Sequence, residues 1–165
     1  MAPTLPVPIE FSLPEGWLAA DPEAGGGVGV AFAAVHPQPD AGFTANITID
    51  GANWADTATL VDLADESVKS LRDFAESVVV ADRREAGSMD APALVQRLAF
   101  SAVADGKRRD LVQSQVYLSM LDVADPHRRA VVRLALTASA SQHDIVLGDF
   151  QDFVRTVRPS AGTEV

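Results

Sequence analysis

The sequence contains no cysteine and no apolar run of the roughly 18 residues that a membrane-spanning helix needs. The first absence excludes disulfides, thiol redox chemistry and thiolate metal sites. The amino terminus also lacks the basic and apolar segments of a secretory signal, and three prolines interrupt residues 1–8. We therefore expect a soluble, cytoplasmic protein that does not insert into membranes.

Positive charge is scarce in the first half of the chain. No lysine or arginine precedes Lys69, whereas ten acidic residues do, and the net charge of the whole chain is −10. Residues 91–165 are nearly balanced, with nine basic and eight acidic residues. This charge repels phosphate backbones and anionic lipids, so nucleic acid is not an expected partner. The acidic half either keeps the protein soluble or attracts a basic partner.

The hydrophobic pattern predicts an α+β fold. A length of 165 residues with 47% hydrophobic content suits a single domain spanning 1–165, with flexible ends at about 1–6 and 160–165. Apolar residues spaced by three and four predict helices at about 59–76 and 142–157, with N-caps at Thr59 and Ser141. Alternation predicts strands at 7–13, 28–36, 43–49, 78–85, 93–103, 108–121 and 129–138.

The strand connections indicate how the sheet is built. An Asp-Gly pair at 105–106 is typical of a tight hairpin, and most of the other strands follow one another through short turns. Hairpins make a sheet antiparallel, and each amphipathic helix must bury its apolar side on a sheet face. We expect a mostly antiparallel sheet of about six to seven strands flanked by helices.

Short motifs add a family resemblance. They are Phe-Ser-Leu-Pro-Glu-Gly-Trp at 11–17, Phe-Thr-Ala-Asn-Ile at 43–47, and Phe-x-x-Phe-Val at 150–154 in the last helix. With these the chain resembles the LpqN/LpqT family of actinobacterial proteins and the wider PsbP-like superfamily of small α/β/α sandwiches. The resemblance implies a non-enzymatic protein that binds other proteins. LpqN-type proteins usually carry a lipidated cysteine, which this chain lacks.

The residues suited to catalysis are few and dispersed. The three histidines, His36, His127 and His143, lie at predicted turns or element ends, without a second ligand at metal-binding spacing. His143 and Asp144 are neighbours and should diverge on a helix, and no Gly-x-Ser-x-Gly elbow is present. We therefore expect no enzymatic activity, cofactor or metal.

Two sets of residues are candidates for binding. Alternation along the long strands predicts one polar row on the sheet, which is either simply exposed or recognises a partner with acidic or amide groups. Its members are Arg97, Gln113, Gln115, Tyr117 and Arg133. A second set could line a pocket between sheet and helix, although each of its members is also explained by core packing. It consists of Trp17, Phe43, Asn46 and Trp54.

Together these observations favour a non-enzymatic accessory protein that binds another protein, with a homodimer as a further possibility. The alternative is a carrier of a small lipophilic ligand in the pocket between sheet and helix. The sequence names neither the partner nor the ligand.

Overall fold

The computed structural model describes most of the chain. The described residues are 5, 7–20, 31–40, 42–54, 59–89, 91–104, 106–121, 127 and 129–160. Most of the two expected flexible ends lies outside these ranges. No helix within them is long and apolar enough to cross a membrane.

Within the described residues, seven strands form one antiparallel sheet in the order β2-β3-β4-β8-β7-β6-β5. They are β2 (Leu18–Ala20), β3 (Phe32–Val35), β4 (Asn46–Asn53), β5 (Glu76–Gly87), β6 (Pro92–Ala104), β7 (Lys107–Leu121) and β8 (Arg129–Ser139). A separate two-stranded sheet pairs β1 (Ile9–Glu10) with β9 (Arg158–Pro159). This arrangement confirms the α+β fold and the antiparallel sheet.

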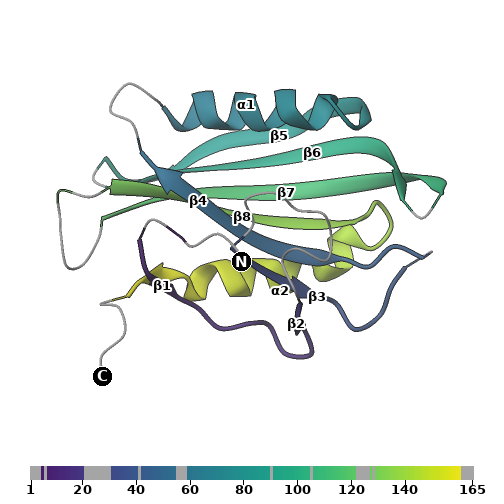
Figure 1. Ribbon diagram of the computed structural model, residues 1–165, viewed down its shortest axis with the longest axis horizontal. Helices are drawn as coiled ribbons and strands as arrows, with labels where there is room; N and C mark the ends of the chain where they lie inside the picture. Colours follow the sequence, from purple (N-terminus) through teal and green to yellow (C-terminus); the bar gives the residue numbers. More distant parts are fainter. Residues whose placement is uncertain are drawn as a thin grey trace.

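The two helices cover opposite faces of the sheet (Figure 1). Helix α1 (Leu60–Arg72) contacts β5 and β6, whereas α2 (His143–Thr156) contacts β8 and β7 on the other face. The two helices are therefore offset across the sheet. On the α2 face, the helix therefore lies over β7 and β8, and β5 and β6 lie beside it.

The apolar residues follow this three-layer arrangement. The largest cluster lies between the sheet and α2 and includes Ile47, Leu134, Phe150 and Phe153, each at most 1% exposed. Two smaller clusters lie on the α1 face, one around Leu60 and Leu94, the other around Val68, Leu98 and Phe100. Both faces of the sheet are thus partly core.

The helix starts were predicted with mixed success. Thr59 caps α1 as expected: its Oγ1 accepts from the Asp62 backbone N–H at 3.1 Å, and the Asp62 carboxylate accepts from the Thr59 N–H. Ser141 does not cap α2, because the N-cap is Gln142 and the Ser141 hydroxyl donates to Asp40 instead. Strand β2, which pairs with β3, was not among the predicted strands.

The expected polar row is wrong at Arg97. The hairpin pairs Ala104 with Lys107, so odd-numbered residues of β6 lie opposite even-numbered residues of β7. Arg97 is therefore opposite Ser114 on the α2 face, whereas Gln113, Gln115 and Tyr117 face α1. The prediction placed the row by alternation within each strand, and the register between strands was not known.

Candidate functional site

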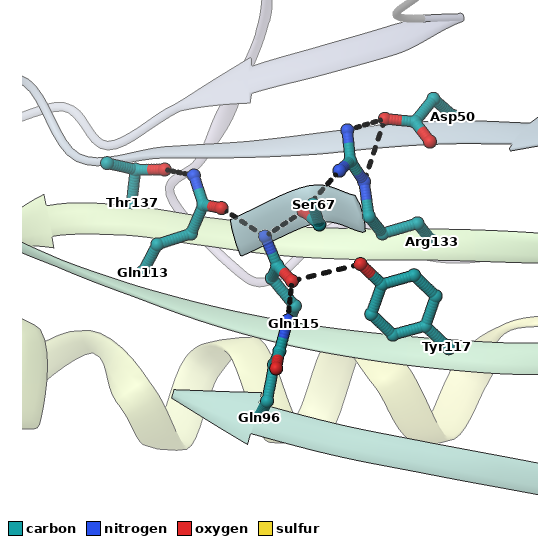
Figure 2. Close-up of polar contacts among 8 residues, drawn as sticks. All are labelled: Asp50, Ser67, Gln96, Gln113, Gln115, Tyr117, Arg133 and Thr137. Carbon is teal, nitrogen blue, oxygen red and sulfur yellow. Dashed lines mark hydrogen bonds and ion pairs between the residues drawn. The ribbon is translucent and has the colours of Figure 1, made fainter. Parts of the chain in front are cut away.

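The polar residues on the α1 face form a continuous hydrogen-bond network, centred on Gln115 (Figure 2). The Gln115 amide nitrogen donates to Ser67 of α1 at 2.9 Å and to the Gln113 side-chain oxygen at 2.5 Å. Its amide oxygen accepts from Gln96 at 2.6 Å and from the Tyr117 hydroxyl at 3.0 Å. One glutamine thus connects two strands to the helix above them.

Arg133 extends this network toward β4. Its guanidinium donates from Nε and Nη2 to one oxygen of Asp50, at 3.1 and 2.5 Å, and from Nη1 to Ser67 at 2.9 Å. Burial raises the pKa of Tyr117 above its usual value, which keeps its hydroxyl protonated as a donor. The charge of Arg133 is thus balanced within the chain, and three of its donor positions are occupied.

These contacts change the interpretation of the polar row. Gln115 is 1% exposed and Tyr117 is 3% exposed, so the prediction that they lie on a sheet surface is wrong. The physical reason is that α1 covers them, and their polar groups are satisfied by one another. A hollow of about 290 Å³ beside α1 is lined by Asp50, Ser67, Tyr117 and Arg133. Its principal cation, Arg133, is already paired with Asp50.

The other face holds a groove between α2 and strands β5 and β6. It has a volume of about 260 Å³, and its floor is apolar. The floor residues are Val95, Val116, Leu147, Phe150 and Val154. We call this hollow the α2 groove. It lies along the side of α2, where that helix does not cover β5 and β6.

The charged side chains of the α2 groove are mostly basic. Arg84, Arg97 and Arg155 line it together with a single acid, Asp82. The Nε atom of Arg97 is buried and has no hydrogen-bond partner among the described residues. Arg97 was a predicted binding residue, and the structure places it here, apart from the other four.

The predicted pocket set does not assemble into one pocket. Trp17 belongs to the core on the α2 face, where its indole N–H donates to Asp149 at 3.1 Å. Phe43 and Trp54 pack on the α1 face against different clusters, Phe43 beside Val68 and Trp54 beside Leu60. The sheet separates these rings, so the expected shared pocket is wrong. The Asn46 side-chain amide donates to the Thr44 carbonyl at 3.3 Å.

A serine, a histidine and a carboxylate meet near the start of α2, which the sequence did not predict. The Ser114 hydroxyl lies 2.8 Å from Nε2 of His143, and Nδ1 of His143 lies 3.3 Å from the Asp144 carboxylate. The expected divergence of His143 and Asp144 is therefore wrong. The order of these groups is that of a hydrolase triad.

The surroundings of these groups do not suit catalysis. The Asp144 side chain is 87% exposed, so water, rather than a buried hydrogen bond, surrounds the carboxylate that would have to orient the imidazole. Ser114 lies within β7, where its backbone belongs to the sheet and no strained turn presents its hydroxyl. The arrangement is that of a buried histidine satisfied by its neighbours.

We expect no covalent labelling of Ser114 by a fluorophosphonate probe. Ser114 is 5% exposed, and its hydroxyl lies within a strand against a histidine whose own carboxylate neighbour is solvated, so attack on phosphorus should not occur. Intact-mass measurement after prolonged incubation should show the unmodified chain. A single adduct that is absent in Ser114→Ala would contradict this prediction and favour an esterase.

We expect the stability of the protein to fall as the pH drops below about 6.5, the ordinary pKa of histidine. Burial, together with the charge of Arg97, lowers the pKa of His143 in the folded protein, although Asp144 opposes this shift. Above the pKa that His143 has in the unfolded chain, its imidazole is neutral in both the folded and the unfolded state, and the folded state has its full stability with respect to this group. Below it, the unfolded chain binds a proton first, and the stabilisation is lost as the pH falls through the folded pKa.

Urea unfolding between pH 7.5 and 5 measures this dependence. In His143→Gln the loss of free energy of unfolding over that interval should be smaller than in the unchanged protein. An equal loss in both proteins would show that other groups cause the acid sensitivity.

Among the described residues, no group of three histidine, aspartate or glutamate side chains could hold a metal ion.

Comparison with known proteins identifies the fold. No protein-family model and no curated protein sequence matches the chain. Among solved structures, LpqN of Mycobacterium tuberculosis, described as involved in cell envelope biogenesis, is 15% identical with a TM-score of 0.58, over 92% of this chain and 83% of that one. The cyanobacterial PsbP of Synechocystis is 16% identical with a TM-score of 0.60, over 92% and 86%.

A third solved structure widens the range of functions found on this fold. The Ran-binding protein Mog1p of Saccharomyces cerevisiae is 13% identical with a TM-score of 0.58, over 92% of this chain and 89% of that one. At these identities the likeness concerns the fold alone. The chain has an LpqN-like, PsbP-like α+β fold, in agreement with the resemblance of its sequence motifs.

Proposed function

We propose that this chain is a non-enzymatic accessory protein that binds another protein at the α2 groove. The observation that carries the proposal is the buried Nε of Arg97, which lacks an acceptor at the edge of an apolar hollow. The buried Nε is itself closed to a partner, but Arg97 lines the groove, is only partly buried and forms no side-chain hydrogen bond or ion pair within the described residues, so the accessible part of its guanidinium can bind an outside acceptor.

The fold supports the same class of function. Mog1p, which shares it, is described as a Ran-binding protein, and LpqN as involved in cell envelope biogenesis. Exposed apolar surface rimmed by polar groups is typical of interaction sites. The arginines at the α2 groove fit a protein partner better than the purely lipophilic ligand of the alternative hypothesis.

The polar network on the α1 face is the weaker candidate. Its amides and its arginine bond to one another, so a partner would have to break existing hydrogen bonds before forming new ones. The network instead fixes α1 on the sheet. We therefore assign Gln113, Gln115, Tyr117 and Arg133 a structural role and retain Arg97 as the binding residue.

Site-specific photocrosslinking tests the proposal. Benzoylphenylalanine at Gln151, an exposed residue of the α2 groove, should yield a defined protein adduct in the source cells. The same group at Lys69, on the exposed side of α1, is the matched control and should not yield that adduct. The captured protein should then bind the purified chain directly.

Two outcomes would contradict the proposal. One is the absence of any protein adduct at Gln151 when the chain is present at its natural level. The other is equal yield of the same adduct from Gln151 and Lys69, because this would mean that capture does not depend on the α2 groove.

A further inference from the structure

Arg97 is a cation at the edge of the α2 groove, with one acid, Asp82, opposite it on β5. Its Nε is buried without a hydrogen-bond acceptor, and it forms no ion pair within the described part of the chain. Ser114, directly opposite on β7, is engaged with His143 at 2.8 Å. Asp82, opposite on β5, follows an irregularity in the strand pairing between Val80 and Asp82 and makes no ion pair with Arg97. The guanidinium thus remains available to an acceptor from outside.

The surroundings of Arg97 strengthen its preference for an anion. Arg84 on β5 and Arg155 on α2 lie around the same groove, and Asp82 is the one acid among its lining residues. Arg155 contacts Asp152, but both side chains are more than 70% exposed, so this pair is weakened by solvent. The charge of the α2 groove is therefore opposite to that of the chain, which is −10.

The apolar floor of the α2 groove favours a ligand that carries apolar groups as well as an anion. Phe150 and Val116 are buried members of the core, while Leu147, Val154 and Val95 are only partly buried. A ligand that placed one or two apolar side chains here would remove this surface from water. The volume of about 260 Å³ is small for a site that encloses a whole lipophilic molecule.

We propose that the α2 groove binds an acidic segment of the partner protein, in which a glutamate or aspartate carboxylate bonds Arg97 and neighbouring apolar side chains contact Phe150. This inference rests on the proposed function and specifies the chemistry of the partner. Arginine suits the role because its planar fork matches a carboxylate and its charge is permanent. Arg84 and Arg155 attract the segment, mainly by raising the rate of association.

Fluorescence anisotropy with defined peptides tests this chemistry. The probe is a labelled peptide that alternates glutamate with leucine or isoleucine. It should bind the full chain at low salt and bind more weakly as salt rises. Arg97→Gln should weaken binding by about tenfold or more, since a charge-assisted hydrogen bond contributes that much. Arg84→Gln should weaken it less, and Arg72→Gln, an exposed arginine on α1, is the matched control and should bind as the unchanged chain does.

Further peptides and ligands identify the source of affinity. A peptide with glutamine in place of each glutamate should bind at least about tenfold more weakly, as should one with serine in place of each apolar residue. Equal binding of the glutamine peptide would overturn the inference. So would unchanged binding in Arg97→Gln, a preference for dodecanoate over every peptide, or a dimer in sedimentation that Gln151→Arg dissociates.

The inference and the proposed function can fail separately. If acidic peptides do not bind while benzoylphenylalanine at Gln151 still captures a specific protein, the α2 groove binds a partner of other chemistry and only the inference is wrong. If neither experiment shows binding, the proposed function is wrong as well.

Discussion

Phe150→Ala should lower the free energy of unfolding by about 3–5 kcal/mol, the largest single effect that we expect. Phe150 is 1% exposed and lies between α2 and the sheet. Its ring stacks on Phe153 with centroids 6.3 Å apart. Removing the ring leaves a cavity that the surrounding strands cannot fill, because antiparallel pairing holds them in place.

Urea unfolding followed by the fluorescence of Trp17 and Trp54 measures this effect. A loss of 3–5 kcal/mol corresponds to a fall in Tm of about 6–20 °C for a chain of this length. Phe74→Ala is the matched control, because Phe74 is 79% exposed and should contribute less than about 1 kcal/mol. Similar losses in the two variants would show that α2 is not packed as described.

Gln115→Leu should cost about 3 kcal/mol or more, although the volume of the side chain hardly changes. The substitution leaves the Gln96 amide and the Tyr117 hydroxyl without their acceptor, and the Gln113 side-chain oxygen without its donor. Each buried polar group that loses its partner costs about 1–3 kcal/mol. Chemical denaturation measures the loss.

The control for this variant is Gln151→Leu, since Gln151 is exposed on α2 and should change stability by less than about 0.5 kcal/mol. The double variant Tyr117→Phe with Gln115→Leu should recover part of the lost stability, because it removes the hydroxyl that Gln115→Leu leaves without its acceptor. If Gln115→Leu is as stable as the unchanged chain, the network does not hold α1 to the sheet.

The sequence predicted the elements well, because their signals are local. Helix α1 has a complete capping box at Thr59, and its apolar spacing matches the buried residues Leu60, Ala64 and Val68. The long strands alternate over enough residues for their existence to be clear. Strand β1 is a two-residue part of the strand predicted at 7–13, whereas β9 has no such pattern, because it forms only by pairing with β1, more than a hundred residues away.

The candidate site was harder to predict, because it depends on how strands and helices meet. Arg97 could be identified as unusual, but its face depends on the register of the β6–β7 hairpin. The burial of Gln115 and Tyr117 depends on where α1 crosses the sheet. In a sheet covered on both faces, a polar row can be core as well as surface, so alternation alone does not distinguish the two.

The contact between Ser114 and His143 shows the same difficulty. The two residues are 29 positions apart and meet only because α2 begins over β7. Sequence spacing cannot reveal such a pair. The carboxylate of Asp144, which contacts His143, is exposed, and this argues against a catalytic role. The exposure of a side chain is a property of the folded surface.

The most direct test of the central claim is a backbone-amide NMR titration of the labelled chain with the acidic peptide. We expect the largest shift changes at Val95–Arg97 on β6 and at Leu147–Arg155 on α2, with Ser67 and Arg133 unchanged. Changes centred instead on Asp50, Glu66 and Ser70, around the hollow beside α1, would contradict the account and return the binding site to the polar face.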